Sequence, residues 1–443
     1  MFKIILLIHL FEKLFSYDGS TFEIYKEQIN ICNNCIPYNL KFSTNGTISV
    51  SIPCLYDVNG TKIDNDIDAT FAIIDPKPKD ISSFSKEYKL YSVMGYTIDI
   101  EDNYYILDQG KIFADNNTVE KNTSKLLIIN AKGENKEEFY FEDIDLTKSL
   151  LTDIVIDHEG KFAYIVDSGN LNNDNNIPGI IVFNIKDKKA YKILNNHDSF
   201  KKNSNKILTS STFKNKLYDY FSNAIGVNSI QISCNDDTIY YSSLYSINIY
   251  SVSTKNISKA IEKFESSNDK NVLNDIEVNS VNRNFFSQKL LISSKNNIFM
   301  INKESKNIEV SFNINGDLSF YDYSRNSKMK FKDNNINSPY SFDIYGRNLY
   351  ILDNKIDNNG INNFSIYKAE LKKDELNNYK GCTIFIFKLN GGVIFVFVWF
   401  FIVLCIAILL IIVNSGQYLE KSRLMKEKEE EEEINELNRK LND

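Results

Sequence analysis

The sequence predicts an all-β body that is followed by a single transmembrane α-helix. The first observation is the stretch Leu151–Gly169, in which two apolar runs that each end in aspartate flank the polar residues His158–Lys161. This order is typical of a β-hairpin, with a strand, a turn that contains glycine and a second strand. A similar order recurs at residues 97–108, 231–242, 291–302 and 342–353. The second observation is an uncharged apolar stretch near the end of the chain, at residues 391–413.

The recurring hairpins predict a repeated unit and not a single sandwich. From Asp108 to Asp167 is 59 residues, and from Asn302 to Asp353 is 51 residues. A unit of about 40–60 residues with three or four strands has the size of a propeller blade. We therefore expect a six-bladed β-propeller over residues 17–380. Two β-sandwiches joined by Asn195–Tyr220 are the alternative, but the hairpin pattern resumes unchanged after that segment.

Residues 1–16 have the pattern of a secretory signal peptide. Lys3 precedes the apolar run Ile4–Phe11, and the small residue Ser16 ends the segment. A buried N-terminal strand is the alternative. We favour the signal peptide because it agrees with the other end of the chain.

Residues 391–413 predict a membrane-spanning helix, because these 23 residues carry no charge. A helix of this length spans roughly 35 Å, whereas the hydrocarbon core of a bilayer is about 30 Å thick. The basic residues that follow are typical of the cytosolic side of a membrane, and they are Lys421, Arg423, Lys426 and Lys428. We therefore expect a single-pass type I membrane protein, with an extracellular or lumenal body and a cytosolic tail at residues 414–443.

The tail is charged and contains the acidic run Glu429–Glu433. Ile434, Leu437 and Leu441 have the spacing of one coiled-coil turn. A solvated helix without a partner is favoured, because one heptad is too short to hold a coiled coil together.

Composition and charge exclude several classes of function. The chain has 443 residues, of which 43% are hydrophobic, so it can bury a sizeable core. The net charge of -7 and the lack of a basic stripe argue against a nucleic-acid partner. His158 falls in a predicted turn and His197 in a predicted polar loop, so neither offers the oriented histidine of a Ser-His-Asp triad. We therefore predict no catalytic residue, no bound metal and no cofactor.

Two sets of residues report on the compartment. Six N-x-Ser/Thr sequons precede residues 391–413 and none follows them, although an asparagine-rich chain also produces sequons by chance. The predicted glycosylation sites are Asn45, Asn59, Asn116, Asn122, Asn256 and Asn363. Cys32 and Cys35 form a CxxC pair without the further ligands that zinc needs. In an oxidising compartment, a local disulfide or a pairing with Cys54 or Cys234 is expected.

Aspartate recurs at the ends of the predicted hairpins, at Asp99, Asp108, Asp157, Asp167, Asp343 and Asp353. The interpretation that we favour is that these carboxylates cap turns by accepting backbone N–H bonds. The alternative places some of them at the central mouth of a propeller, where carboxylates bind an amine or a calcium ion. The candidate ligand-binding residues are then Asp108, Gln109, Gly110, Asp167, Ser168, Asp353 and Asn354.

Several of these blocks resemble the yellow and major royal jelly protein family. Residues 92–110 are similar to a family segment with a valine-rich strand, a turn and a Leu-Trp-Val-Leu-Asp-x-Gly strand. The family's later blocks resemble residues 151–169 with 178–193, and residues 226–254, while residues 35–53 and 338–354 fit its first and last parts. The sequence departs from the family at Tyr105 and Tyr350, where tryptophan is usual, and at Cys54, where arginine is common.

The resemblance implies a six-bladed propeller, in agreement with the blade count. It implies mixed activities, since some members of the family are associated with dopachrome conversion, some bind biogenic amines in the central channel, and some are storage or structural glycoproteins. We expect a membrane-anchored propeller that binds a small molecule or a protein partner at its channel. A dopachrome-converting isomerase and a structural glycoprotein are the alternatives.

Overall fold

The computed structural model of the chain divides into two units, residues 1–384 and residues 385–443. The first unit is described at residues 23–25, 37–53, 70–74, 87–110, 112–113, 118–119, 124–130, 137–141, 149–169, 177–200, 227–243, 246–282, 287–292, 298–302, 308–311, 329–331, 336, 339–346, 348–356 and 362–370. The second unit is described at residues 419 and 421–434.

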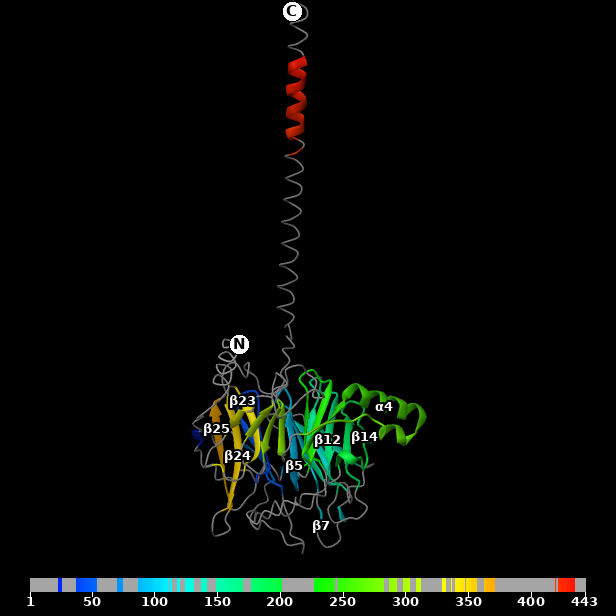
Figure 1. Cartoon of the computed structure of the whole chain (residues 1–443), viewed down its shortest axis with the longest axis vertical. Helices are drawn as coiled ribbons and strands as arrows, with labels where there is room; N and C mark the ends of the chain where they lie inside the picture. Colours follow the sequence, from blue (N-terminus) through cyan, green and yellow to red (C-terminus); the bar gives the residue numbers. More distant parts are fainter. Residues whose placement is uncertain are drawn as a thin grey trace, which may run out of the picture. The chain divides into compact units, whose positions relative to one another are not determined.

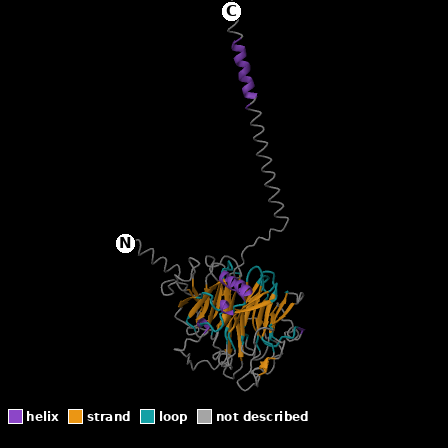
Figure 2. Ribbon diagram, turned by 90° about the vertical axis from the view of Figure 1, so that its right-hand side faces the viewer, coloured by secondary structure: helices purple, strands orange, loops and turns teal. Residues whose placement is uncertain are grey.

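The first unit is built from antiparallel sheets, as Figures 1 and 2 show. Five of the sheets have four strands each. The first sheet contains β5 (Val93–Ile98), β6 (Tyr104–Asp108), β9 (Lys125–Ile129) and β10 (Glu137–Tyr140), and the second contains β11 (Leu151–Ile156), β12 (Phe162–Asp167), β13 (Gly179–Asn184) and β14 (Lys189–Ile193). The third contains β15 (Val227–Ile232), β16 (Thr238–Ser243), β17 (Asn248–Ser253) and β18 (Asn279–Asn282), and the fourth contains β19 (Ser287–Ile292), β20 (Ile298–Asn302), β21 (Ile308–Ser311) and β22 (Met329–Phe331). The fifth contains β23 (Pro339–Tyr345), β24 (Asn348–Ile356), β25 (Asn362–Glu370) and β1 (Glu23–Tyr25).

A sixth sheet has three strands, β2 (Asn39–Phe42), β3 (Ile48–Ser51) and β4 (Phe71–Ile74), and β7 (Ile112–Phe113) pairs with β8 (Thr118–Val119). The described residues therefore form five complete blades, where the sequence predicts six. Residues 75–86, which follow β4, lie outside the described part of the chain.

The first strands of the sheets form a closed ring. In order around it are β2, β5, β11, β15, β19 and β23, and β23 lies next to β2 again. The N-terminal strand β1 pairs with β25, so both ends of the body contribute to one blade. The protein is thus an all-β propeller, as predicted.

The hairpins form where the sequence predicts them, and β11 and β12 illustrate why. Asp157 ends the first strand, and its carboxylate accepts hydrogen bonds from the backbone N–H groups of Lys161 (2.7 Å) and Phe162 (3.2 Å). Gly160 has a φ of +66°, a conformation that glycine adopts without steric cost. Asp157 therefore caps a turn, which is the interpretation that we favoured for the recurring aspartates.

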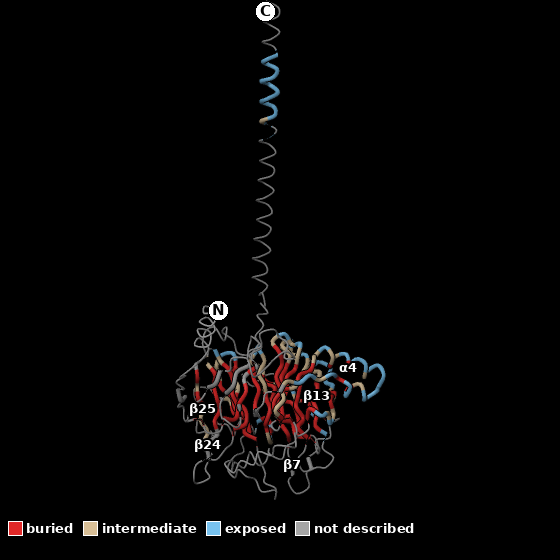
Figure 3. Tube along the Cα trace, viewed as in Figure 1, coloured by how far each residue is buried: buried red, intermediate tan, exposed pale blue. Residues whose placement is uncertain are grey.

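Apolar side chains fill the space between neighbouring blades, and Figure 3 shows the buried residues concentrated in the strands. One core cluster joins β12 to β15 through residues that include Tyr164, Val182 and Ile230. Another joins β6 to β11 and β13 through Leu107, Ile154 and similar side chains. Each blade thus covers the apolar face of the next. Closure of the ring also leaves few unpaired sheet edges.

The helix α4 (Thr254–Ser267) lies beside β17. It contributes to the core, because Ile257 and Ile261 are buried there. Its Glu265 accepts a hydrogen bond of 2.5 Å from the Tyr191 hydroxyl of the preceding blade. Within the segment predicted to be a loop, residues 198–200 form the 3-10 helix η2, and η3 (Lys270–Leu273) follows α4.

The predicted signal peptide, residues 1–16, and the predicted membrane span, residues 391–413, lie outside the described residues. Both therefore stay predictions. No helix among the residues that the structure describes is both long and apolar enough to cross a bilayer. In the second unit, residues 421–434 form a helix that is almost entirely exposed, with an ion pair of 3.2 Å between Arg423 and Glu427.

Candidate functional site

Asp108, the first predicted site residue, ends β6 and is fully buried. Its carboxylate accepts hydrogen bonds from the backbone N–H groups of Ser92 (2.8 Å), Gly110 (3.0 Å) and Tyr91 (3.1 Å). Burial raises the pKa of the Asp108 carboxyl to about 6, against the lowering effect of these donors and of the Lys125 ammonium. The side chain thus ties the end of β6 to the start of β5.

Asp167 occupies the same position at the end of β12. Its Oδ1 accepts from the backbone N–H groups of Leu150 (2.9 Å) and Gly169 (2.8 Å). Its Oδ2 accepts from the Ser149 hydroxyl (2.6 Å) and the Lys192 ammonium (2.6 Å). Both carboxylate oxygens are therefore engaged by the protein's own donors.

Gln109 and Ser168, which follow these aspartates, join adjacent blades. The Gln109 side-chain amide donates to the carbonyl oxygen of Leu151 at the start of β11. The Ser168 hydroxyl donates to the carbonyl oxygen of Val227 at the start of β15. These predicted ligand-binding residues thus form polar links between blades.

Asp353 and Asn354 lie in β24, where Asp353 pairs with Pro339 at the start of β23. Asp353 is buried, like Asp108 and Asp167. All three aspartates lie beside the start of an inner strand, and so on one face of the propeller, which we call the aspartate face. The carboxylates of Asp108 and Asp167 each accept hydrogen bonds from their own blade. Within the described parts of the chain, no three metal-ligating side chains come together.

A different set of residues gathers at the centre of the ring. The pairing register shifts near the start of β5, β11, β15, β19 and β23, as it does at a β-bulge. The third residues of these strands are Gly95, Asp153, Ser229, Lys289 and Ser341. The bulge thus repeats at the same strand position in all five blades.

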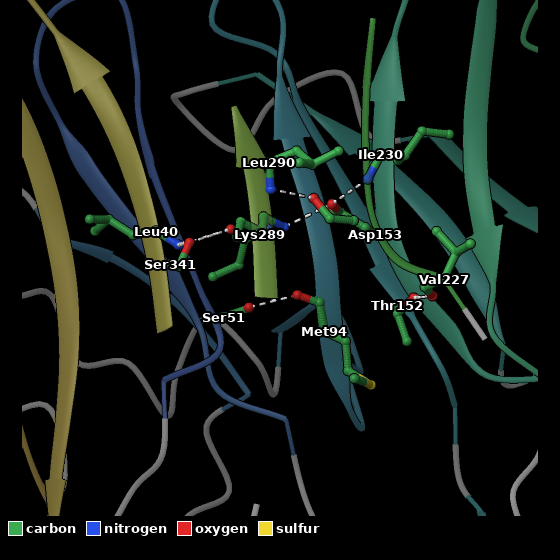
Figure 4. Close-up of polar contacts among 12 residues, drawn as sticks. Leu40, Ser51, Met94, Thr152, Asp153, Val227, Ile230, Lys289, Leu290 and Ser341 are labelled. Carbon is green, nitrogen blue, oxygen red and sulfur yellow. Dashed lines mark hydrogen bonds and ion pairs between the residues drawn. The ribbon is translucent and has the colours of Figure 1, made fainter. Parts of the chain in front are cut away.

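The third residues bond to the next inner strand in a repeated pattern. The backbone N–H of Ile230 donates to Asp153 (3.1 Å), and that of Leu290 donates to Ser229 (3.0 Å). The backbone N–H of Leu40 donates to the hydroxyl of Ser341 (3.3 Å), as Figure 4 shows. Ile230 and Leu290 follow the third residues of their strands and Leu40 follows Asn39, so a polar contact of the same kind is used at three blade junctions.

Gly95 shows how closely these strands approach. A Cβ atom on Gly95 would lie 2.8 Å from the Cα of Asp153 and 3.0 Å from its backbone nitrogen. Only glycine leaves room for the neighbouring backbone at that distance. The contact of β5 with β11 therefore fixes the position of Asp153 in the ring.

Lys289 and Asp153 form a buried ion pair at the centre. The Lys289 ammonium donates to Asp153 Oδ2 at 2.8 Å, and the two side chains are 5% and 1% exposed. Figure 4 shows this bond together with the bond from Ile230 to Asp153. Since β15 lies between β11 and β19 in the ring, the ion pair connects two blades that are not neighbours.

Other titratable groups surround this pair. Burial lowers the pKa of the Lys289 ammonium, and the nearby charge of Lys41 lowers it further, while Asp153 and Asp343 raise it. Burial, and then the charge of Asp153, raises the pKa of the Tyr38 hydroxyl. Charged or polar side chains from β2, β11, β19 and β23 thus act on one another inside the ring.

The two histidines of the body bond to side chains of the protein. The Nδ1 atom of His158 lies 2.5 Å from Asp236 Oδ1, which joins the hairpin turns of two adjacent blades. The Nδ1 atom of His197 bonds to the hydroxyl of Ser199 (2.9 Å) in the first turn of η2. The His158 bond therefore connects two blades, whereas the His197 bond is local to the start of η2.

The predicted glycosylation sites and disulfide cysteines are spread over the body. Asn45 is exposed in the turn between β2 and β3, Asn256 lies in the first turn of α4, and Asn363 lies in β25. Cys234 is disulfide-bonded in the turn between β15 and β16. The other predicted positions lie outside the described residues, and they are Asn59, Asn116, Asn122, Cys32, Cys35 and Cys54.

The recurring aspartates of the sequence indicate the ends of the hairpins and not the central residues. A signal was present, since the third residue of four of these strands is charged or carries a hydroxyl group: Asp153, Ser229, Lys289 or Ser341. A charged residue in a buried strand requires a partner, and a partner on another strand is not visible from one strand alone. Aligning the five repeats by their hairpins would have placed these residues at one level.

The fold and the central residues define a β-propeller whose inner strands hold a buried ion pair. The sequence profile of the major royal jelly protein family matches residues 91–378 of the chain. The chain belongs to this family. Among solved structures, it is similar to a luciferin-regenerating enzyme, with 10% sequence identity, a TM-score of 0.46, and coverage of 83% of this chain and 99% of that one. No curated protein matches the sequence.

Proposed function

We propose that this protein is a membrane-anchored propeller that binds a small polar molecule at the centre of its ring. The observation that supports the proposal is the buried ion pair of Lys289 and Asp153. Burial of a charged pair costs desolvation energy that an apolar pair would not, so such a pair is weak evidence for stability. At the centre of the ring, the pair offers both a charged donor and a charged acceptor to a ligand.

The second part of the proposal concerns the sheet of β2, β3 and β4, which takes the place of the sixth blade. Its first strand β2 lies between β23 and β5 in the ring of inner strands. Tyr96 of β5 donates a hydrogen bond of 2.5 Å to the carbonyl oxygen of Ser49 in β3. These contacts are of the kind that join the other blades, which supports six positions around the centre.

The third part concerns the anchor. Residues 391–413 would cross the membrane, with the propeller in an extracellular or lumenal space and residues 414–443 in the cytosol. The length and lack of charge of residues 391–413 support this. Resistance of the full chain to alkaline extraction from membranes, and its release after deletion of residues 391–413, is the expected result. Extraction of the full chain by alkali would contradict the anchor.

The ligand proposal is tested by a thermal-shift screen of small polar molecules on the detergent-purified full chain. A ligand that raises the melting temperature should lose its effect in the double variant Asp153→Asn with Lys289→Met, which removes both charges together. Lys189→Met is the matched control, because the Lys189 ammonium is exposed and pairs with Glu265 on the outer surface. An equal shift in the double variant and in the control would refute binding at the centre.

The predicted ligand role of the aspartate face is tested in the same screen. Asp108, Asp167 and Asp353 are replaced together by asparagine, and the ligand titration is repeated. Because Asp108 and Asp167 already accept bonds from the protein, we expect lower stability with the ligand shift retained. Loss of the melting-temperature shift at full ligand excess would indicate that the ligand binds at the aspartate face instead.

A further inference from the structure

The two carboxylates that act on the Lys289 ammonium already have donors of their own. Asp153 accepts from that ammonium (2.8 Å) and from a backbone N–H of β15 (3.1 Å). Asp343, in β23, accepts from the backbone N–H groups of Phe42 (2.9 Å) and Ile344 (2.9 Å). Both carboxylates are therefore stabilised by the protein without a ligand.

Asn39, the first residue of β2, holds a donor that lacks an acceptor. Its side-chain oxygen accepts from the hydroxyl of Ser341 (3.0 Å) and from the backbone N–H of Leu40 (3.1 Å). These two bonds distinguish the oxygen of the amide from its nitrogen. The nitrogen, Nδ2, is buried and forms no hydrogen bond within the described residues. A buried donor without an acceptor is costly, so a ligand that supplies an acceptor is favoured there.

Lys41 lies on the same side of β2 as Asn39. The two residues are two positions apart in a strand, whereas Leu40 and Phe42 face the opposite side and pack in an apolar cluster. The Lys41 side chain is half-buried. Its ammonium forms no ion pair and no hydrogen bond with another described residue. Lys41 thus brings a second set of unused donors to the side of β2 that carries the Asn39 amide.

The Lys41 ammonium also acts on the ion pair at the centre. Burial, and after it the charge of Lys41, lowers the pKa of the Lys289 ammonium, while Asp153 and Asp343 raise it. Like charges inside a ring of low dielectric constant repel each other strongly. An anion that binds near Lys41 reduces this repulsion, whereas a cation increases it.

The ring is more open at the end of the inner strands than at their start. The strands β2, β5, β11 and β15 run from the aspartate face to hairpin turns, and these turns, at residues 43–47, 99–103, 157–161 and 233–237, define the hairpin face. Lys41 and Thr97, which lie one step nearer to the hairpin face than Asn39 and Gly95, are half-buried. Asn39 and Gly95 are fully buried. A ligand therefore reaches Lys41 from the hairpin face.

We infer that the ligand at the centre is a small organic carboxylate, held by the Lys41 ammonium and the Asn39 side-chain amide. The inference rests on the proposed function, because it names the class of ligand for the same site. The two oxygens of a carboxylate accept from an ammonium and from an amide N–H together, and bonds between charged partners are the strongest of this kind. The unused groups on this side of β2 are donors, and a carboxylate supplies only acceptors.

The same groups disfavour an amine. An ammonium has three donors and no acceptor, so it would add donors beside those of Lys41 and Asn39. Asp153 and Asp343 are the carboxylates that it would need, and both already accept bonds from the protein. The charge of Lys41 also repels a cation. A carboxylate and an amine of the same shape should therefore differ in affinity for this centre.

The test compares matched probes on the detergent-purified full chain, at one pH and one ionic strength. Butyrate and phenylacetate are the carboxylates, and butylamine and phenethylamine are their cationic counterparts. We expect the carboxylates to raise the melting temperature and the amines to leave it unchanged. A shift from the amines alone, lost in the double variant Asp153→Asn with Lys289→Met, would overturn the carboxylate while the proposed central site stands. The absence of a shift from all four probes would also overturn it, and the wider screen then decides the proposed function.

Two variants and a control assign the binding residues. Lys41→Met removes the charge, and Asn39→Asp keeps the acceptor oxygen but replaces the Nδ2 donor with a second oxygen, so each should weaken carboxylate binding about tenfold or more. Lys161→Met is the control, because Lys161 is exposed on the hairpin face and pairs with Glu159. Unchanged binding by Lys41→Met, or equal weakening by Lys161→Met, would overturn the inference. Since the Lys41 ammonium bonds to no described residue, its variant should fold even if Asn39→Asp does not.

Discussion

The Lys289 ammonium reaches Asp153 across the ring of inner strands, from β19 past β15 to β11, and the two atoms lie 2.8 Å apart. Asp153 Oδ2 also accepts the backbone N–H of Ile230 in the strand between them. One carboxylate oxygen therefore holds three consecutive inner strands together. Removal of the Asp153 carboxylate therefore affects two blade junctions and not one.

Removal of one partner of this pair should destabilise the protein strongly. Lys289→Met leaves the Asp153 carboxylate buried without its cation, which costs about 3–5 kcal/mol. Asp153→Asn together with Lys289→Met should recover much of this loss, because the amide oxygen of the introduced asparagine still accepts from Ile230. Chemical denaturation of the three proteins measures the free energies of unfolding. Additive losses in the double variant would contradict a direct pair.

Gly95→Ala should lower stability through a clash between β5 and β11. The added Cβ would lie 2.8 Å from the Cα of Asp153, so one of the strands must move. We expect a loss of about 2–4 kcal/mol, in the range of overpacked or strained cores. Gly346→Ala is the control, since its φ is +60° and no described atom lies within 4 Å of the added Cβ. That variant should lose only about 1 kcal/mol from backbone strain, and equal losses would refute the clash.

The Asp108 carboxyl should make stability depend on pH between about 4 and about 6. Its pKa is about 6 in the folded protein, whereas an unperturbed aspartate has a pKa of about 3.9. The folded state therefore holds the proton to higher pH, and ionisation lowers stability as the pH rises through this window. Relative to Asp108→Asn, the unaltered protein should lose about 2 kcal/mol between pH 4 and pH 6.5. A difference that stays constant over this range would show that the folded-state pKa is not raised.

Asp108→Ala should be worse than Asp108→Asn at every pH. Alanine leaves the backbone N–H groups of Ser92, Gly110 and Tyr91 without their carboxylate acceptor. Each buried donor without an acceptor costs about 1–3 kcal/mol. Melting curves of the two variants under identical conditions provide the measurement, and equal stabilities would indicate that water replaces the carboxylate.

Asp236 should matter for the junction between the hairpin turns at residues 157–161 and 233–237. Its Oδ2 accepts the backbone N–H of His158 (3.0 Å), its Oδ1 bonds to the imidazole, and its own φ is +59°. Asp236→Ala loses both bonds and adds strain, so we expect a loss of about 2 kcal/mol. Asp236→Asn tolerates the conformation and keeps one acceptor, and should lose less than about 1 kcal/mol. The reverse order in urea denaturation would contradict this.

The local parts of the fold could be predicted from the sequence because they depend on neighbouring residues. The hairpin of β11 and β12 follows from alternation, from Gly160 and from the capping of the turn by Asp157. The propeller followed from the repetition of that hairpin. The blade of β1 with β23 to β25 could not be found in this way, since its strands come from the two ends of the body.

The candidate site was predictable in its chemistry but not in its location. Aspartates at strand ends were expected to cap turns or to bind a ligand, and Asp108 and Asp167 bond to their own blades. The charged centre depends on which strands meet, and Lys289 and Asp153 are 136 residues apart in the sequence. Neither strand alone indicates that its charged residue has a partner.

The pairing of β1 with β25 sets a condition on how the protein is made. Tyr25 pairs with Ile366, a residue that is synthesised 341 positions later. At about 5–20 residues per second, the N-terminal strand waits roughly 17–70 seconds for its partner. During that time its edge is unpaired, and it is open to other chains. Production of this protein should therefore depend on factors that bind exposed strands in the newly made chain, more than its stability after closure would suggest.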